Sequence, residues 1–476
     1  MAKVTHTSKA CSVNPLKMSA PIGAALAFMG LENCLPTLHG SQGCTSFGLV
    51  VFVRHFREMI PMQTTAMSEV TTILGGMDNI EQTIVNIWKR NQPSILGIAS
   101  TGLTETKGDD VDAYLKLIAQ KHPELADMHI LYVSTPDYVG AFQDGWSKAV
   151  LKIVQHFAQP ANIRHARRVN VLAGSHLTPG DLQEIRDIIE LFGLEAVMLP
   201  DISGSLDGHI PEDFTPTTLG GTTLEQLNTL GAARANIAIG EQMRPAAQLL
   251  EEKTGVAYRL FDRLTGLSAS DAFIQHLSEL SGLPVPLKLR RQRSQCQDAM
   301  LDAHFYTGGK TVAIGAEPDL LWAYGQFLLE MGCDLRAVTT TQSAILEQLP
   351  IYEVLIGDLE DLEQRAQDCD LLLTHAHGRQ MAERLHLPFM RIGIPVFDRI
   401  GAAHKVTVGY RGTRDLAFEL ANTFLAETHE PAPDTWYAQP PADTPSQACQ
   451  CGPTGGCHSN ESPIESQVQW STPAMN

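Results

Sequence analysis

The chain has 476 residues and a net charge of −18, with 43% hydrophobic and 18% charged residues. A chain of this length is too long for one hydrophobic core and predicts about three domains. The acidic balance argues against nucleic acid and anionic membrane surfaces as partners. Because there is neither a run of about 18 apolar residues nor the apolar core of a signal peptide, we expect a soluble cytoplasmic protein.

Short apolar strands alternate with helical patterns along most of the chain. The strand-like runs form three sets, which lie at 93–101 and 128–136; at 168–175, 195–201, 235–240 and 256–262; and at 311–319, 334–341, 352–358, 370–378 and 388–395. Continuous apolar strands that end in Gly, Ser, Thr or Asp before a helix are typical of parallel sheets covered on both faces. The sequence therefore predicts an α/β protein with three doubly wound, Rossmann-like domains and mostly parallel sheets.

The changes in composition along the chain predict domains at 1–163, 164–300 and 301–430. In open α/β sheets ligands bind beyond the carboxyl ends of the strands, so each strand-end loop is a candidate wall of a site. Residues 431–476 are rich in Pro, Ser, Gly and Gln and cannot bury much apolar surface. This composition favours a flexible, disordered tail.

The nine cysteines are not expected to form disulfides in a reducing cytosol. Cys333 and Cys369 each precede an apolar strand and are expected to be buried and structural. The tail offers three thiols and an imidazole, a four-ligand set for zinc or a labile cluster, at Cys449, Cys451, Cys457 and His458. Their spacing is not a standard zinc pattern, and a disordered tail without metal is the favoured alternative.

Three other motifs resemble sites but have simpler structural readings. TGGKT at 307–311 resembles the end of a P-loop, but the following residues read as a strand, so we expect a turn. THAHG at 374–378 could bind a metal through two imidazoles, but the end of a strand is favoured. GGTTLE at 220–225 is most simply a helix start capped by threonine. No Ser-His-Asp or paired-carboxylate arrangement can be recognised, so no catalytic residue is assigned.

The run LHGSQGC at 38–44 carries the clearest chemical signal. Its glycines permit close approach of backbone N–H groups to a bulky anion. Residues from Thr45 onward read as a helix, whose N-terminus favours a thiolate at Cys44. An iron–sulfur cluster needs such a thiolate and N–H donors toward its sulfides. A tight turn with a buried thiol is the equal alternative.

The number of available ligands sharpens the cluster hypothesis. A cluster usually has four protein ligands. The first two hundred residues contain only Cys11, Cys34 and Cys44, and no CxxC lies near Cys44. If Cys44 binds a cluster, most of the other ligands must therefore come from another chain.

Four stretches resemble the nitrogenase component 1 superfamily, and the resemblance covers about residues 12–428. They are VNPLKMSAPIGA at 13–24, LPTLHGSQGC at 35–44 with RHFRE at 54–58, STG at 100–102 with KGDD at 107–110, and MRIGIPVFDRIGAAHKVTVGYRG at 390–412. LPDISGSLDGH at 199–209 and GGTT at 220–223 are similar to the members of this superfamily that assemble cofactor. The runs HGSQGC and IGIPVFDR are long and distinctive.

The departures from the catalytic β subunit of this superfamily are informative. That subunit supplies three cysteines to an eight-iron P-cluster, and the matching positions here are Ser19, Cys44 and Gly102. Serine is a poor iron ligand and glycine is none, so half of a P-cluster is not expected. The resemblance instead implies one [4Fe–4S] cluster at each interface of an α2β2 heterotetramer. A NifE-like subunit would supply three ligands and this chain one, Cys44.

The resemblance implies a scaffold for cofactor assembly, not an enzyme. The precursor of the iron–molybdenum cofactor would be held mainly by the NifE-like subunit while it receives molybdenum and homocitrate. The nitrogenase iron protein would supply reduction, and a cluster-donating assembly protein would be a further partner. The alternative is the β subunit of a nitrogenase or of the related dark-operative protochlorophyllide reductase. Molybdenum and vanadium systems both stay open.

Overall fold

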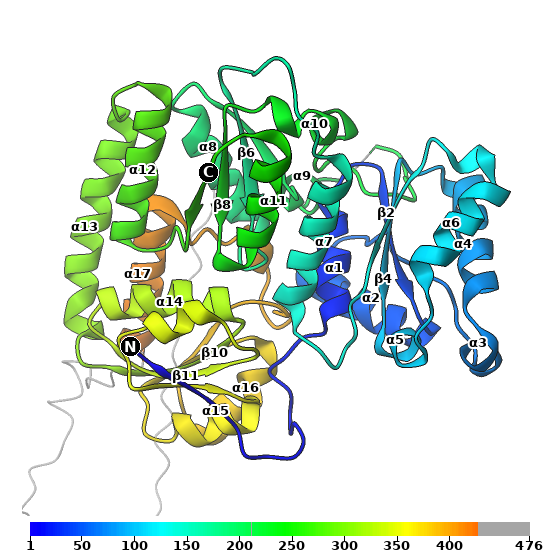
Figure 1. Cartoon of the computed structure of the whole chain (residues 1–476). Helices are drawn as coiled ribbons and strands as arrows, with labels where there is room; N and C mark the ends of the chain where they lie inside the picture. The colour runs from blue at the N-terminus through cyan, green and yellow to red at the C-terminus, as the bar shows by residue number, and fades with distance from the viewer. Residues whose placement is uncertain (211, 427–476) are drawn as a thin grey trace, which may run out of the picture. The chain divides into compact units, whose positions relative to one another are not determined.

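Three parallel β-sheets organise the chain, whose computed structural model describes residues 1–210 and 212–426 (Figure 1). The first sheet has the order β3 (Gln63–Thr64), β2 (Cys34–His39), β4 (Ile95–Ser100), β5 (His129–Val133). The second has the order β7 (Glu195–Leu199), β6 (Arg168–Ala173), β8 (Ala235–Ile239), β9 (Tyr258–Phe261). The third has the order β1 (Lys3–His6), β12 (Glu353–Ile356), β11 (Asp334–Thr339), β10 (Thr311–Ala316), β13 (Leu371–Thr374), β14 (Phe389–Arg391).

Helices connect the strands and cover the sheets. Those of the first part of the chain are α1 (Ala20–Met29), α2 (Gln42–Phe56), α3 (Glu69–Leu74), α4 (Met77–Asn91), α5 (Gly102–Lys107), α6 (Val111–Lys121) and α7 (Phe142–Phe157). Those of the middle part are α8 (Pro179–Glu190), α9 (Ile202–Ser205), α10 (Leu224–Asn228), α11 (Arg244–Thr254), α12 (Leu267–Ser281) and α13 (Leu287–Thr307). The remaining helices are α14 (Pro318–Glu330), α15 (Leu359–Ala366), α16 (Arg379–Leu385) and α17 (Gly409–Ala426).

The predicted fold class is confirmed, since the three sets of strand-like runs lie in the three sheets and all their pairings are parallel. Strand β2 was missed because Pro36 lies within it. Proline cannot donate to a sheet and argues against a central strand. It is tolerated here because β3 pairs only with Thr37 and Leu38, which leaves that side of Pro36 without a partner strand.

Strand β1 was also missed. It pairs in parallel with β12, about 350 residues along the chain, and so completes the edge of the third sheet. Nothing in a four-residue run points to so distant a partner. The domain limits 1–163, 164–300 and 301–430 remain predictions, and the predicted disordered tail at 431–476 lies outside the described residues. Within the described part of the chain, no helix is long and apolar enough to cross a membrane.

Two glycines bring helices α1 and α7 into backbone contact beside the first sheet (Figure 1). A Cβ atom on Gly23 would lie 1.8 Å from the carbonyl oxygen of Phe142, and one on Gly145 would lie 1.8 Å from that of Ala20. Only residues without a side chain permit this approach. The contact fixes α1, and with it Ser19 at the helix N-terminus, against the rest of the core.

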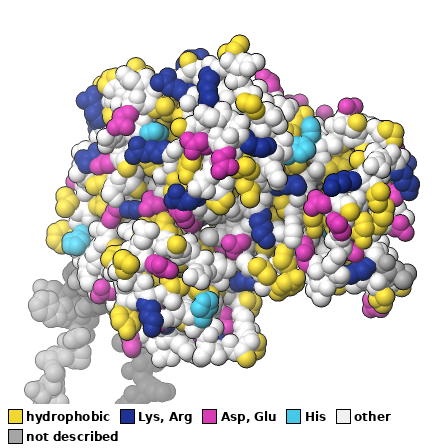
Figure 2. All heavy atoms as spheres, in the orientation of Figure 1, with side chains coloured by type: hydrophobic (Ala, Val, Ile, Leu, Met, Phe, Trp, Pro, Cys, Tyr) yellow, Lys and Arg dark blue, Asp and Glu magenta, His cyan; other side chains and the backbone are white. Residues whose placement is uncertain are grey.

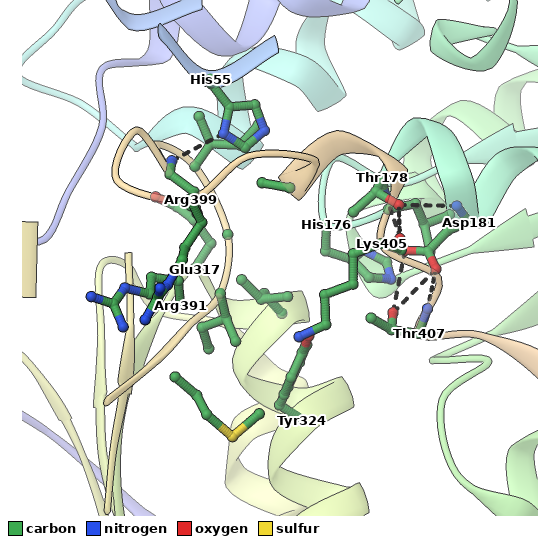
Figure 3. Close-up of a pocket in the computed structure, with 18 of the residues that line it drawn as sticks. His55, His176, Thr178, Asp181, Glu317, Tyr324, Arg391, Arg399, Lys405 and Thr407 are labelled. Carbon is green, nitrogen blue, oxygen red and sulfur yellow. Dashed lines mark hydrogen bonds between the residues drawn. The ribbon is translucent and has the colours of Figure 1, made fainter. Parts of the chain in front are cut away.

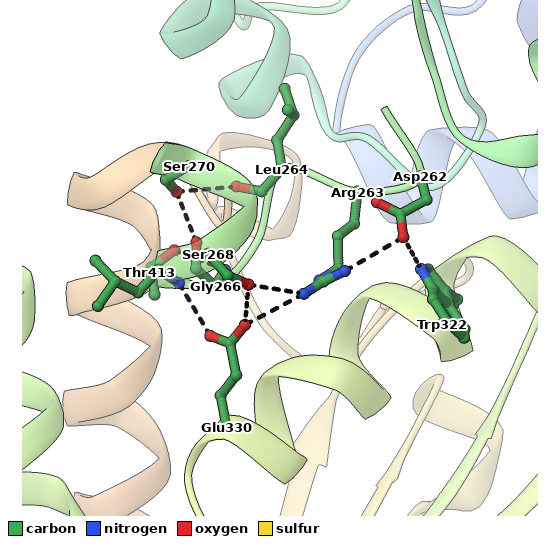
Figure 4. Close-up of polar contacts among 10 residues, drawn as sticks. Asp262, Arg263, Leu264, Gly266, Ser268, Ser270, Trp322, Glu330 and Thr413 are labelled. Carbon is green, nitrogen blue, oxygen red and sulfur yellow. Dashed lines mark hydrogen bonds and ion pairs between the residues drawn. The ribbon is translucent and has the colours of Figure 1, made fainter. Parts of the chain in front are cut away.

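A buried polar network joins the segment after β9 to α14 and α17 (Figure 4). The Glu330 carboxylate accepts hydrogen bonds from the Leu267 N–H at 3.0 Å and the Ser268 hydroxyl at 2.5 Å. It also pairs with Arg263 at 3.2 Å, and the Arg263 side chain is only 12% exposed. The Gly266 N–H donates to the Thr413 hydroxyl of α17 at 3.0 Å. Glu330 thus shares the largely buried Arg263 guanidinium with Asp262, 3.3 Å away, and accepts a hydrogen bond from the first turn of α12.

Replacing Glu330 by alanine should lower the free energy of unfolding by about 1–3 kcal/mol, because the Leu267 N–H loses its acceptor and Arg263 keeps only Asp262, at 3.3 Å, as a carboxylate partner. Chemical denaturation would measure the loss. The matched control is Glu363→Ala. It breaks the Glu363–Arg384 ion pair, whose arginine is 53% exposed, and should cost less than about 1 kcal/mol. Equal losses in the two variants would contradict the stabilising role of Glu330.

Candidate cluster-binding loop

Cys44 lies in the first turn of α2, directly beyond the carboxyl end of β2. The helix begins at Gln42, three residues before the expected start at Thr45, because Ser41 already has the extended backbone of an N-cap. The Cys44 thiol is half-buried, and its only hydrogen-bond contact among the described residues is the Ser41 hydroxyl at 3.5 Å. The first N–H groups of a helix lack intrahelical partners and favour an anion beside them. The residues present therefore fit a single thiolate ligand.

The carbonyl group of His39 holds this loop beside the next strand. Its oxygen lies 3.2 Å from the Thr101 N–H nitrogen, 3.0 Å from the Thr101 hydroxyl and 3.1 Å from the Thr104 hydroxyl. The parallel register of β2 and β4 pairs His39 with Ser100, so both strands end at the same level. The loop that carries Cys44 and the N-terminus of α5 consequently lie side by side.

A second set of bonds fixes Gly40 from the other side. Its N–H donates to the Thr65 hydroxyl at 3.2 Å, and its carbonyl accepts from the Met67 N–H at 2.9 Å. The same Thr65 hydroxyl lies 2.9 Å from Nδ1 of His39. Burial lowers the pKa of His39 to about 4, so its ring is neutral at pH 7. The residues that precede Cys44 are thus held by hydrogen bonds between uncharged groups, and none of these groups changes its protonation state near pH 7.

In the sequence, Ser19 and Gly102 stand, together with Cys44, at the positions that match the three P-cluster cysteines of the catalytic β subunit. Both residues lie at helix N-termini of the region around the first sheet. Ser19 is the N-cap of α1, and Gly102 is the first residue of α5. The N–H of Gly102 donates to the Asp137 carboxylate at 3.0 Å. A Cβ on Gly48 of α2 would lie 2.7 Å from the Ile22 side chain of α1, so these two helices touch one turn beyond Ser19 and Cys44.

The other cysteines of the first part of the chain lie elsewhere. Cys34 is fully buried at the opposite end of β2, about 16 Å from His39 along an extended strand. Its burial raises the thiol pKa strongly. Cys11 is exposed in a segment that Lys9 and Val13 tie to Asp358 of the third sheet. Among the described residues no group of three or more Cys, His, Asp or Glu side chains could hold a metal ion.

An exposed apolar surface, which we call the α2 face, lies around Cys44. It comprises the exposed side chains Phe47, Val50 and Val53 of α2, Leu103 of α5, and Tyr138 and Val139 of the loop after β5. All three elements follow strands of the first sheet at its carboxyl edge. Figure 2 shows hydrophobic side chains gathered on the lower part of the region that carries α2. Sequence reasoning missed this face, although α2 is apolar on its exposed side as well as its buried side, which is a signal of a covered helix.

The three motifs at 307–311, 374–378 and 220–225 have the structural roles expected from the sequence. TGGKT at 307–311 is the end of α13, a turn and the start of β10. Thr223 caps α10 by accepting from the Gln226 N–H at 3.1 Å. His375 is buried and donates from Nε2 to the Leu16 carbonyl at 2.9 Å. Cys333 and Cys369 are buried, as predicted. Cys449, Cys451, Cys457 and His458 lie outside the described residues.

Known proteins share this fold over nearly the whole chain. A sequence profile of the nitrogenase component 1 type oxidoreductases matches residues 19–425. The solved structure of nitrogenase Cp1 at pH 6.5 superposes with a TM-score of 0.83 at 32% identity, covering 88% of this chain and 95% of that one. The chain therefore belongs to the nitrogenase component 1 type oxidoreductase family.

Within this family, the similar relatives share one name. The nitrogenase iron-molybdenum cofactor biosynthesis protein NifN of Bradyrhizobium diazoefficiens is 58% identical, over 92% of this chain and 96% of the relative. That of a Nostoc species is 52% identical, over 89% and 96%. The resemblance found in the sequence is thereby confirmed, and it extends to the cofactor-assembly members in particular.

Gly40→Ala and Gly43→Ala form a matched pair that tests the packing of the loop. A Cβ on Gly40 would lie 2.4 Å from the Thr101 hydroxyl, whereas one on Gly43 would meet only the Ser41 hydroxyl, at 3.8 Å. We expect Gly40→Ala to destabilise the protein by about 1–3 kcal/mol through overpacking. Gly43→Ala, inside a helix, should be neutral or stabilising by up to about 1 kcal/mol. Denaturation midpoints would check both, and equal midpoints would contradict the close packing of Gly40 against Thr101.

Proposed function

We propose that this chain is the scaffold subunit of a NifE–NifN type complex, on which a precursor of the nitrogenase iron–molybdenum cofactor matures before transfer to the catalytic protein. The observation that carries the proposal is a lone thiol, Cys44, at a helix N-terminus inside an exposed apolar face. Cys44 supplies one ligand to a [4Fe–4S] cluster, and a NifE-like subunit supplies the other three. Two such pairs form an α2β2 heterotetramer.

Two physical arguments support a shared site. A cluster needs more thiolates than the described residues bring to Cys44, which supports a second chain as the source of the remaining ligands. Contiguous apolar surface is rarely left exposed to water, and its position around Cys44 puts the subunit contact where the missing ligands are needed. The cluster, when bound, supplies electron transfer. Cys44 holds it, and the apolar face excludes water from it.

The role is assembly, not substrate reduction. Relatives at about half identity or more are cofactor biosynthesis proteins by name. The catalytic alternative, a β subunit of a nitrogenase-like reductase, is disfavoured because Ser19 and Gly102 stand where its cluster needs thiols. The precursor is held mainly by the NifE-like subunit. The nitrogenase iron protein and a cluster-donating assembly protein are the further proposed partners.

Cys44→Ala should remove the interface cluster from the co-expressed complex, since alanine cannot ligate iron. The measurements are iron content and the EPR signal of the reduced complex. Cys11→Ala is the matched control, because that exposed thiol lies in a segment tied to the third sheet. We expect it to keep the wild-type signal. Full retention of the cluster in Cys44→Ala would contradict the central assignment.

Phe47→Asp should weaken association with the NifE-like subunit. Phe47 is 56% exposed one turn beyond Cys44, and a charge buried at an apolar contact without a partner costs about 2 kcal/mol or more. Analytical ultracentrifugation or native mass spectrometry would show free subunits. Ile163→Asp is the control, because Ile163 is 78% exposed in the segment between α7 and β6, away from this face. If both variants assemble equally well, the α2 face is not the subunit contact.

A further inference from the structure

A cavity of about 380 Å³ lies where elements of all three sheets meet (Figure 3). Its walls come from the end of α2, the loop after β6, helix α14 and the segment that follows β14. The loops after β6 and β14, and the start of α14 after β10, follow carboxyl ends of strands, where open α/β proteins bind ligands. This volume is in the range of small-molecule sites. The cavity is separate from the Cys44 loop, and the runs 54–58 and 390–412 supply much of its wall, although neither run by itself predicted a cavity.

Several hydrogen-bond donors on its walls have no acceptor among the described residues. The Tyr324 side chain is 5% exposed, yet its hydroxyl forms no hydrogen bond there. Nδ1 of His55 accepts the Val396 N–H at 3.0 Å, so the neutral ring carries its proton on Nε2, which has no partner. Both ring nitrogens of His176 are buried without a partner. Buried polar groups normally have partners, so the unpartnered ring of His176 indicates a missing ligand, and the Tyr324 hydroxyl and Nε2 of His55 on the same walls are free to donate to it.

The charged groups of the cavity favour an anion. Lys405 extends into it toward the Tyr324 hydroxyl and pairs with Glu419 at 2.6 Å, which leaves ammonium protons for a ligand (Figure 3). Arg399, at the opposite wall near His55, has no ion pair among the described residues. The Asp181 carboxylate acts on Lys405 electrostatically, but its oxygens are already occupied by the N–H groups of Thr407 at 2.6 Å and of Thr178 at 3.0 Å, so it is held beside the loop and not presented to a ligand.

Glu317 adds a further donor instead of a negative charge. Burial raises the pKa of this carboxyl to about 8, so it is protonated at pH 7. Its Oε1 atom is buried and has no hydrogen-bond partner. Apolar side chains form the rest of the wall, among them Phe56, Phe142 and Leu320. An inorganic anion would leave these apolar surfaces without contact, whereas a carbon skeleton would cover them.

We propose that the cavity binds a small organic acid with carboxylates at both ends. One carboxylate meets Lys405 and Tyr324, the other meets Arg399 and His55, and the carbon chain lies between them against the apolar wall (Figure 3). Two cationic positions on opposite walls, one of them the exposed Arg399, match a ligand with two separated anionic groups. This site does not rest on the role of Cys44.

Isothermal titration of the purified full-length protein at pH 7 tests the proposal. The probes are succinate, glutarate and adipate, with the neutral diamide of glutarate and inorganic phosphate as comparisons. We expect at least one dicarboxylate to bind and both comparison compounds to bind much more weakly. The proposal is overturned if no dicarboxylate binds up to about 10 mM, at the weak end of specific affinity. It is also overturned if phosphate binds as tightly as the best dicarboxylate.

Two variants connect this binding to the cavity. Tyr324→Phe removes only an unpaired hydroxyl and should weaken binding about fivefold. Lys405→Met keeps most of the side-chain length but removes the charge, and should weaken binding at least tenfold or so. The matched controls are Tyr352→Phe, at an exposed tyrosine, and Lys310→Met, which breaks a similar half-exposed pair with Asp370. Wild-type affinity in both cavity variants would place binding elsewhere and refute the assignment.

Discussion

Helix α2 is fixed at both of its ends, and this constraint determines where the two candidate sites lie. At its N-terminal side, the His39 carbonyl and the bonds to Gly40 hold the loop that delivers Cys44. At its C-terminal side, Nδ1 of His55 accepts the Val396 N–H, and Arg57 donates to the Phe397 carbonyl at 3.0 Å. A helix held in this way cannot shift along its axis without breaking bonds to two different sheets. The rise of a helix places Cys44 about 16 Å from His55.

This arrangement separates two kinds of chemistry on one rigid element. The exposed side of α2 is apolar and carries the thiol, which suits contact with another subunit and exclusion of water. The buried end carries a neutral imidazole beside a cavity rich in donors. The buried apolar side chains Val51 and Phe52 lie along α2 between the Cys44 thiol and the His55 ring. They separate the thiol at one end of the helix from the cavity at the other. A partner docked on the α2 face could therefore hold a cluster without closing the cavity.

The sequence predicted those features that depend on local pattern. The glycines before Cys44 and the apolar run after it indicated a loop that opens a helix, and the apolar strands indicated parallel sheets. It could not predict features made by distant segments. His55, Tyr324 and Lys405 line one cavity but come from three distant segments of the chain, and nothing in each segment alone shows that the three side chains meet. Pro36 concealed β2 because its tolerance depends on how short the neighbouring strand β3 is.

Ser19 and Gly102, the two compared positions without thiols, bear on the proposal that Cys44 holds a small, shared cluster. At Gly102 a Cβ would lie 3.3 Å from the Asp137 carboxylate, a close contact that a small shift of this side chain would relieve. That carboxylate also accepts the Gly102 N–H, which removes one donor that an anionic cluster could use. A negative charge at this point repels sulfide-rich iron clusters, which are themselves anionic. The chain thus lacks two of the thiols expected in the catalytic relatives and places the Asp137 carboxylate beside one of those positions. In the proposed complex, the α5 side of Cys44 would offer a cluster no ligand, and the remaining ligands would come from a second subunit over the apolar face.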